Sequence, residues 1–245
     1  MKLASVGEVI AEIRGGRVVV LVDEDTPESE GYLCAAAEKV TPETVNFMLL
    51  HGRGLVSVGL TEERMKQLGI PLMVQESSST PGSVFGASIA LKADLSAAAS
   101  AASRARAIRA TAAGDAKRSD FVTPGYVFPV QARNGGVLVR SGQVEAAVDL
   151  AHLAGLRPSG VVCQILQDDG AVALAPYLQT FIARHRLKAV SIAELIAYRL
   201  RSECLVKRVA EAAFPTHLPR PRRRPAAVSH VSQSAREAEA SPRSC

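Results

Sequence analysis

Short runs of Val, Leu and Ile alternate along this chain with stretches whose apolar residues have helical spacing. This alternation limits the possible folds, because elements that follow each other in this way pack as layers of an α/β or α+β domain. The predicted strands and extended pieces are residues 17–22, 55–60, 84–91, 124–130, 136–139, 160–166 and 188–190. The predicted helices are residues 4–14, 42–51, 61–68, 96–112, 145–153, 175–185 and 192–201.

The composition supports one sizeable core built from small and aliphatic side chains. The 245 residues are 47% hydrophobic, include no Trp and are only 4% aromatic. No apolar stretch approaches the roughly 18 residues that span a bilayer, and early acidic residues argue against a secretory signal. The cysteines form no CxxC pair, so we expect reduced thiols in a cytoplasmic protein without a zinc site. They are Cys34, Cys163, Cys204 and Cys245.

An acidic loop, residues 23–31, directly follows the predicted strand 17–22. It reads Asp-Glu-Asp-Thr-Pro-Glu-Ser-Glu-Gly. Clustered carboxylates at the end of a strand are suited to a cation or a polyol. Considered alone, the same residues also fit a solvated surface loop.

The last 40 or so residues have a different character from the rest of the chain. Beyond Pro215, apolar periodicity ends and Pro, Arg, Ser and Ala dominate. Such a segment buries too little surface to offset its ordering entropy, so the sequence predicts a disordered tail. Much of the net charge of +5 lies in this tail, at Arg220 and residues 222–224. A local basic tail predicts no specific nucleic-acid partner.

Four blocks carry a resemblance that covers about residues 5–201. They are VVVLVDEDTPESEG, AAEKVTPETVNFMLLHGRGLVSVGLTEERMKQLGIPLMV, PGYVFPVQARNGGVLVRSGQVEAAVDLAHLAGLRPSGVVCQILQDDG and VSIAELIAYR. In order and spacing they resemble the 3,4-dihydroxy-2-butanone 4-phosphate synthases of riboflavin biosynthesis. The resemblance implies an α+β domain over 1–201, with a mixed sheet and surrounding helices. It also implies a homodimer with the active site near the interface, and magnesium-dependent conversion of ribulose 5-phosphate to formate and the butanone phosphate.

The acidic loop keeps only part of the family's pattern. By resemblance Glu28 is the metal-binding glutamate, and Glu30 is retained beside it. Pro27 replaces a substrate-contacting arginine, and Tyr32 replaces a substrate-binding aspartate. Proline has neither charge nor backbone donor, so that change is not conservative.

The segment Arg-Ser-Gly-Gln-Val-Glu stands where the family has Arg-x-Gly-His-Thr-Glu. Arg140 matches the phosphate-binding arginine. Gln143 replaces the second metal ligand, a histidine, and its amide is a weaker ligand than imidazole for most metals. Val144 replaces a phosphate-binding threonine and removes its hydroxyl donor.

The two positions treated as essential for catalysis in the family are also substituted. Tyr126 replaces a histidine, and is either a substitute proton donor or a filler of a vacated pocket. Gln164 replaces a glutamate and cannot accept a proton near neutral pH. Gln164 is either a satisfied core amide or a polar substrate contact. Ser103 replaces an aspartate, so another carboxylate is lost.

The end of the chain resembles a fusion point. Residues 202–216 are similar to the junction that leads into GTP cyclohydrolase II in bifunctional enzymes, and the basic segment 217–245 follows in place of the cyclohydrolase. We therefore expect no cyclohydrolase activity.

Two classes of function remain open on the sequence. In the first, the chain is a divergent enzyme acting on a phosphorylated sugar, either an impaired synthase or a repurposed lyase or isomerase. In the second, it is a non-catalytic partner or regulator that forms a heterodimer with an active synthase or another riboflavin-pathway enzyme. In both, binding of Mg²⁺ or Mn²⁺ is expected to be weakened or absent.

Overall fold

The computed structural model describes residues 2–23, 26, 28–74, 84–94 and 99–203. It also gives the backbone of residues 206–207 and 230–231. Pro27, Cys204 and Cys245 lie outside the described residues, as do most of the predicted junction 202–216 and tail 217–245.

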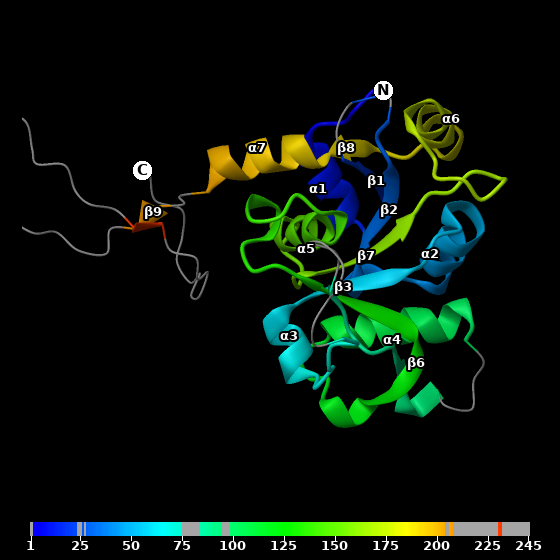
Figure 1. Ribbon diagram of the computed structural model, residues 1–245, viewed down its shortest axis with the longest axis vertical. Helices are drawn as coiled ribbons and strands as arrows, with labels where there is room; N and C mark the ends of the chain where they lie inside the picture. Colours follow the sequence, from blue (N-terminus) through cyan, green and yellow to red (C-terminus); the bar gives the residue numbers. More distant parts are fainter. Residues whose placement is uncertain are drawn as a thin grey trace, which may run out of the picture.

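A mixed sheet of eight strands organises the fold (Figure 1). Its strands are β1 (Val19–Val22), β2 (Gly31–Ala36), β3 (Ser57–Thr61), β4 (Val84–Phe85), β5 (Ile89–Leu91), β6 (Phe121–Ala132), β7 (Ser159–Gln164) and β8 (Ala189–Ser191). They lie in the order β4-β6-β3-β7-β2-β1-β8, and β5 pairs with β6. The pairs β1–β8 and β3–β6 are parallel and the others antiparallel. Two short strands, β9 (Val206–Lys207) and β10 (His230–Val231), form a separate antiparallel pair.

Within the described residues, seven α-helices surround the sheet, which confirms the predicted α+β class. They are α1 (Val6–Arg14), α2 (Pro42–Phe47), α3 (Glu62–Gln67), α4 (Ala101–Ala112), α5 (Gln143–Leu153), α6 (Ala175–His185) and α7 (Ile192–Ser202). Hydroxyl side chains begin most of them: Ser5, Thr41, Thr61, Ser100 and Ser191 each accept a hydrogen bond from a backbone N–H of the first turn.

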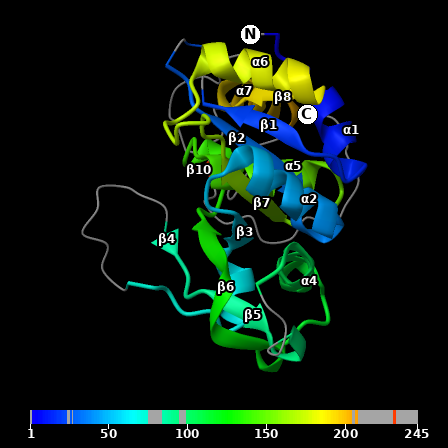
Figure 2. The ribbon, with the colours of Figure 1, turned by 90° about the vertical axis from the view of Figure 1, so that its right-hand side faces the viewer.

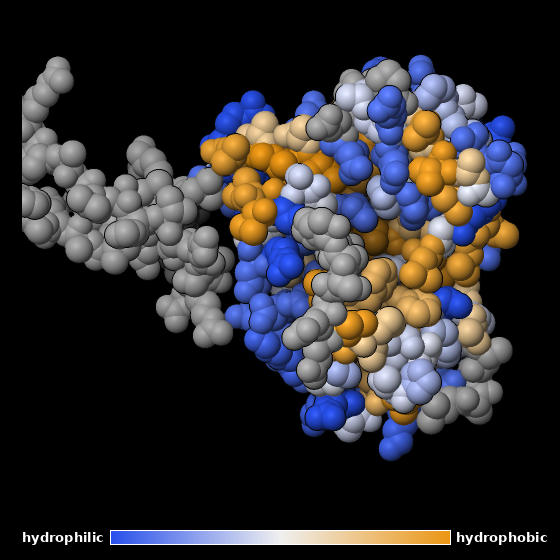
Figure 3. Space-filling view, in the orientation of Figure 1, coloured by the Kyte–Doolittle hydropathy of each residue, from blue (hydrophilic) through white to orange (hydrophobic). Residues whose placement is uncertain are grey.

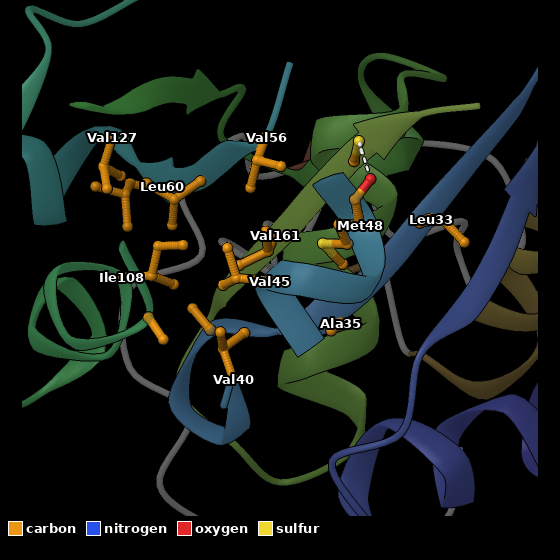
Figure 4. Packing of buried hydrophobic residues seen from close by; sticks show 14 of the residues in the cluster. Leu33, Ala35, Val40, Val45, Met48, Val56, Leu60, Ile108, Val127 and Val161 are labelled. Atoms are coloured by element: carbon orange, nitrogen blue, oxygen red, sulfur yellow. Dashed lines mark hydrogen bonds between the residues drawn. The ribbon is translucent and has the colours of Figure 1, made fainter. Parts of the chain in front are cut away.

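Helices cover both faces of the sheet, so most strands are buried on both sides. Helices α1, α5 and α7 pack with Val19 and Leu21 of β1 in one apolar cluster. Helices α2, α4 and α6 pack with Val20 and Val22 in the other. Figure 4 shows part of this second cluster, including Val45 of α2 and Ile108 of α4. Burial on both faces explains why β1 is a continuous apolar run rather than an alternating one. In Figure 2, β4, β5 and β6 lie with α4 at the end of the molecule opposite α6 and α7.

Several predicted elements differ from the observed ones. Strand β2 was not predicted, the run 84–91 is two strands separated at Gly86, and the helix 42–51 changes to a π-helix at Met48–Gly52. Residues 136–138, predicted to be extended, form a 3₁₀ turn because Gly135 and Gly136 both adopt positive φ. Predicted helix 96–112 begins at Ala101, and residues 95–98 lie outside the described part.

The two cysteines within the described residues are free thiols in the protein interior. Burial raises the pKa of Cys34 to about 12, and burial likewise raises that of Cys163 to about 12. Cys163 Sγ lies 3.3 Å from the Gly54 carbonyl oxygen and 3.6 Å from that of Met48, the contact drawn in Figure 4. These thiols therefore behave as small apolar core groups.

A close approach of β7 to α5 gives a test of the packing. A Cβ added at Gly160 would lie 2.6 Å from the Ala147 carbonyl oxygen, whereas nothing lies within 4 Å of one added at Gly7 in α1. We expect Gly160→Ala to lower the free energy of unfolding by about 1–3 kcal/mol. Gly7→Ala should leave it unchanged or raise it by up to about 1 kcal/mol. Urea unfolding of both variants measures the difference, and equal effects would contradict the packing.

Candidate active site

Pairing of β2 with β7 brings three of the predicted site residues together. Tyr32 lies directly opposite Gln164 in the antiparallel register. The Tyr32 hydroxyl donates to Glu30 Oε2 at 2.8 Å, and Gln164 Nε2 donates to the same oxygen at 2.8 Å. Gln164 Nε2 also lies 3.4 Å from the Tyr32 hydroxyl. We call Glu30, Tyr32 and Gln164 the β2–β7 cluster.

The protonation chemistry of this cluster follows from its contacts. Burial is the largest cause that raises the pKa of Tyr32, and its hydrogen bond to Glu30 raises it further. The phenol therefore keeps its proton throughout the neutral range and acts as a donor. Gln164 is an amide and has no titratable proton. The cluster thus contains one carboxylate held by two neutral donors.

The segment just before β3 lies close to the backbone of Gln164. The Gly54 N–H donates to the Gln164 carbonyl oxygen at 3.2 Å. A Cβ added at Gly54 would lie 2.5 Å from that oxygen and 3.0 Å from the Gln164 Cβ. Glycine at this position therefore allows the segment before β3 to lie against β7 and to hold Gln164 in place.

Glu28, the predicted metal ligand, lies in a turn just before β2. The turn is closed by Thr26 and Ser29: the Thr26 N–H donates to Ser29 Oγ at 3.3 Å, and the Ser29 N–H donates to the Thr26 carbonyl at 3.3 Å. Glu28 is exposed, whereas Ser29 is buried and Glu30 half-buried. Of these two glutamates, Glu28 is therefore solvated and Glu30 belongs to the β2–β7 cluster.

A second group of predicted residues lies at the start of α5. Gln143 is the first helical residue and is half-buried. Val144 is only 3% exposed and packs in the same apolar cluster as α1 and α7, against β3 at Gly59. The structure thus places Val144 in the core. Tyr32 also packs against this apolar cluster. The β2–β7 cluster and the residues at the start of α5 therefore lie on the same face of the sheet, the one that α5 covers.

Arg140 lies at the end of a loop, residues 133–142, that wraps around the start of α5. Its Nη1 is 3.5 Å from Oε1 of Glu145, a side chain with no exposed surface. The Arg133 N–H also donates to Glu145 Oε1 at 3.0 Å. Within the described residues, Glu145 Oε2 and Arg140 Nη1 have no hydrogen-bond partner. A positive side chain with unused donors, one quarter exposed, is suited to an anion.

A buried ion-pair network anchors the same loop to α7. Asp149 Oδ2 accepts the Val137 N–H at 2.8 Å and Arg199 Nη1 at 2.6 Å. Arg199 Nη1 also donates to the Gly135 carbonyl at 3.0 Å, and the guanidinium pairs with Glu203 at 2.7 Å. Burial raises the pKa of Asp149 against the opposing effect of its two donors. The loop that bears Arg140 is therefore tied to α5 and to the end of α7.

Tyr126 stands apart from the β2–β7 cluster. The Arg104 guanidinium donates to its carbonyl oxygen at 2.6 Å and lies 5.8 Å from its ring centroid. The ring packs against the apolar cluster on the α4 side, and its buried hydroxyl has no hydrogen-bond partner among the described residues. Among the described residues, no hydrogen bond joins Tyr126 to Gln164. Both interpretations of Tyr126, filler and substitute proton donor, stay predictions.

Sequence reasoning missed the residues that hold the site. Glu145, Asp149 and Arg199 were not singled out, although each contacts the loop that carries Arg140. The sequence held one signal: Glu145 and Asp149 are four residues apart in a predicted helix, so both carboxylates lie on one helix face. The structure shows that both are buried. Buried acids at that spacing imply polar partners.

Comparison with known proteins supports the family on independent grounds. Residues 7–198 match the model of the 3,4-dihydroxy-2-butanone 4-phosphate synthase family. The chain belongs to this family of riboflavin biosynthesis. It is 49% identical over 217 residues to the riboflavin biosynthesis protein RibBA of Aquifex aeolicus, covering 88% of this chain and 53% of that protein. It is 46% identical over 218 residues to a Pseudomonas aeruginosa synthase, covering 89% and 60%.

Solved structures agree with the fold. RibBX, a two-domain synthase from A. baumannii, superposes with a TM-score of 0.80 at 42% identity, over 87% of this chain and 63% of that one. A synthase solved in complex with two magnesium ions superposes with a TM-score of 0.75 at 34% identity, over 82% of this chain and 98% of that one. The chain spans only about half to three fifths of the curated relatives quoted above.

Two features are absent from the described residues. None of their helices is long and apolar enough to span a bilayer. They also contain no group of three or more His, Cys, Asp or Glu side chains placed to hold a metal ion.

The network around Arg199 predicts a measurable coupling between α7 and the loop. Arg199→Gln leaves the buried Asp149 without its cationic partner, and we expect a loss of about 3 kcal/mol in the free energy of unfolding. Amide exchange at Val137 should accelerate, because its N–H donates to the same carboxylate. The control is Lys66→Gln, which removes the exposed pair with Glu62 and should cost less than about 1 kcal/mol. Equal losses in the two variants would show that Arg199 does not anchor the loop.

Proposed function

We propose that this chain is a divergent synthase-family protein that binds a phosphorylated sugar but converts ribulose 5-phosphate to the butanone phosphate and formate poorly. The observation that carries the proposal is the β2–β7 cluster. The carboxylate of Glu30 accepts hydrogen bonds from Tyr32 and Gln164, at positions where the family has an aspartate and a glutamate. Two acidic side chains of the family are thus replaced by two neutral ones, and both of these donate hydrogen bonds to the carboxylate of Glu30.

The family's reaction depends on proton transfers that this arrangement does not support. Enolisation, dehydration, rearrangement and loss of formate each move protons to or from a polyol. General acid–base groups contribute about 10²–10⁴-fold each to such steps. Gln164 has no titratable group, and the raised pKa of Tyr32 keeps its phenol protonated. Tyr126, at the second essential position, has its hydroxyl buried on the α4 side.

The residues that remain are a poor fit to a magnesium centre. A related synthase has been solved in complex with two magnesium ions. Here the matching side chains are the exposed carboxylate of Glu28 and the neutral amide of Gln143. Mg²⁺ favours carboxylate oxygens together with substrate phosphates and water, and Mn²⁺ prefers similar ligands. One carboxylate and one amide support weak binding of either ion at most, and the proposed role needs no metal-dependent step.

Ligand binding is better preserved than chemistry. Arg140 retains the family's anion-binding arginine, and Glu145 together with the network of Asp149 and Arg199 keeps its loop in place. A protein that keeps the phosphate contact but loses proton transfer fits a binding role. A repurposed lyase or isomerase acting on another phosphorylated sugar would need an acid–base group outside the positions described above.

The second candidate function is that of a non-catalytic partner in the cytoplasm. Large apolar side chains are exposed in the segment between α2 and β3, at Leu49, Leu50 and Leu55. Figure 3 shows apolar residues gathered over the middle of one face of the molecule. Exposed apolar surface of this kind marks association sites. It favours a homodimer, or a heterodimer with an active synthase or another enzyme of riboflavin biosynthesis.

The proposed impairment predicts very slow formate release. With ribulose 5-phosphate and magnesium, we expect a rate at least about 10²-fold below that of the Pseudomonas aeruginosa synthase assayed alongside. The restored variant carries Tyr32→Asp, Tyr126→His, Gln143→His and Gln164→Glu together. It should release formate faster and rescue a strain that lacks the synthase, whereas the unaltered chain should not. Formate release by the unaltered chain at the rate of the active synthase would refute the proposal.

The association site predicts a specific effect of one surface substitution. Leu50→Glu should shift the chain towards monomer, because Leu50 is 58% exposed and a buried unpaired carboxylate is costly. Leu200→Glu, on α7 and 54% exposed, is the matched control and should leave the assembly unchanged. Sedimentation velocity of the full chain, alone and mixed with an active synthase, measures both. If Leu50→Glu behaves as the unaltered chain does, this segment is not the interface.

A further inference from the structure

A pocket distinct from the candidate active site lies between α3, the end of α4 and the residues before β7. Its volume is about 180 Å³. One water needs only about 10–15 Å³ of such space, so the pocket admits a group of several heavy atoms. Arg64, Arg157 and Ser159 contribute to its wall, together with Glu63 and Gln67. Figure 1 shows α3 beside α4, on the opposite side of β3 from the start of α5.

Arg64 brings a positive charge that its own contacts do not cancel. Its Nε donates to the Thr111 carbonyl at 2.7 Å and its Nη1 to Gln67 Oε1 at 3.2 Å, while its Nη2 donates to the Ala113 carbonyl. All three acceptors are neutral oxygens. A guanidinium has five N–H donors, so two remain for another acceptor.

Arg157 places a second guanidinium beside the first. A Cβ added at Gly114 would lie 2.4 Å from Arg157 Nη2, so this side chain lies against the turn that follows α4. Burial lowers the pKa of Arg64, and the charge of Arg157 lowers it further, against the opposing effect of Asp115. The two cations are therefore close enough to repel each other. Two carboxylates lie near these arginines: Glu63 contributes to the pocket wall, and Asp115 acts on Arg64.

Ser159 supplies the observation that points to a ligand. It is the first residue of β7 and is only 2% exposed. Its hydroxyl has no hydrogen-bond partner among the described residues. Leaving a buried polar group unpaired costs about 1–3 kcal/mol, so a hydroxyl in this position is expected to have a partner.

We propose that this pocket binds a small phosphate-class oxyanion, with Arg157 and Arg64 pairing its charge and Ser159 donating a hydrogen bond. A phosphate oxygen accepts from guanidinium and hydroxyl donors alike, and it relieves the repulsion between the two arginines. The ligand is free inorganic phosphate or the phosphate of a phosphomonoester. The site shares no residue with the loop of Arg140, so it goes beyond the proposed function and does not depend on it.

The test follows individual backbone amides of the full chain while inorganic phosphate is added at constant ionic strength. We expect the amide signals of Gly114 and Ser159 to shift in a saturable way, and chloride at the same ionic strength to leave them in place. Arg157→Gln should weaken the apparent affinity at these amides at least about tenfold. Arg140→Gln is the matched control and should leave it unchanged. Absence of shifts, equal affinity in Arg157→Gln, or loss only in Arg140→Gln would each overturn the proposal.

Two further measurements test the role of Ser159 and the identity of the ligand. Ser159→Ala should weaken phosphate binding about three- to tenfold, yet leave the phosphate-free protein as stable as before or more stable, because it removes an unpaired buried hydroxyl. A loss of stability without any change in affinity would mean that Ser159 has only a structural role and would overturn its assignment. Ribulose 5-phosphate serves as the phosphomonoester probe. Tighter binding than inorganic phosphate at the same amides supports a phosphomonoester ligand, and equal or weaker binding supports free phosphate.

Discussion

The antiparallel pairing of β2 with β7 is the constraint on which the candidate site depends. Its register sets Tyr32 opposite Gln164 and directs both side chains to Glu30. Directly opposite residues of two antiparallel strands lie close enough for their side chains to interact. Since both donors are neutral and the acceptor is a carboxylate, the cluster is satisfied internally. A polar cluster that is satisfied internally stabilises the fold. Under the proposed function, these hydrogen bonds make its groups less available for proton exchange with a substrate.

The contacts that hold the loop of Arg140 involve none of the substituted positions. Glu145 and Asp149 hold the loop of Arg140 through backbone N–H groups, and Arg199 connects that loop to the last helix. None of these contacts requires a catalytic residue, so they survive whether or not the chain turns over substrate. The proposed separation of ligand binding from catalysis rests on this loop and on a cluster whose carboxylate is held by two neutral donors.

The sequence predicted the fold class, the family and most helices, and α6 was predicted with its observed bounds of 175–185. Strand β2 was missed because its sequence, Gly-Tyr-Leu-Cys-Ala-Ala, contains no β-branched side chain and includes glycine and alanine, which are depleted in strands. The residues of the β2–β7 cluster were identified by resemblance, but their shared hydrogen bonds depend on a pairing between residues 132 positions apart. For the same reason the unpaired hydroxyl of Tyr126 could only be located in three dimensions.

The substitutions at this site act as a set. Changing Gln164 alone to glutamate would replace a donor 2.8 Å from Glu30 Oε2 with a second carboxylate, and like charges at that distance raise the pKa of one of them. Changing Tyr32 alone to aspartate would do the same from the opposite strand, where the hydroxyl now donates at 2.8 Å. Each single reversal would thus bring two acids together without a cation to balance them. A metal ion or a basic substrate contact must return together with the carboxylates, so single substitutions do not readily undo this arrangement.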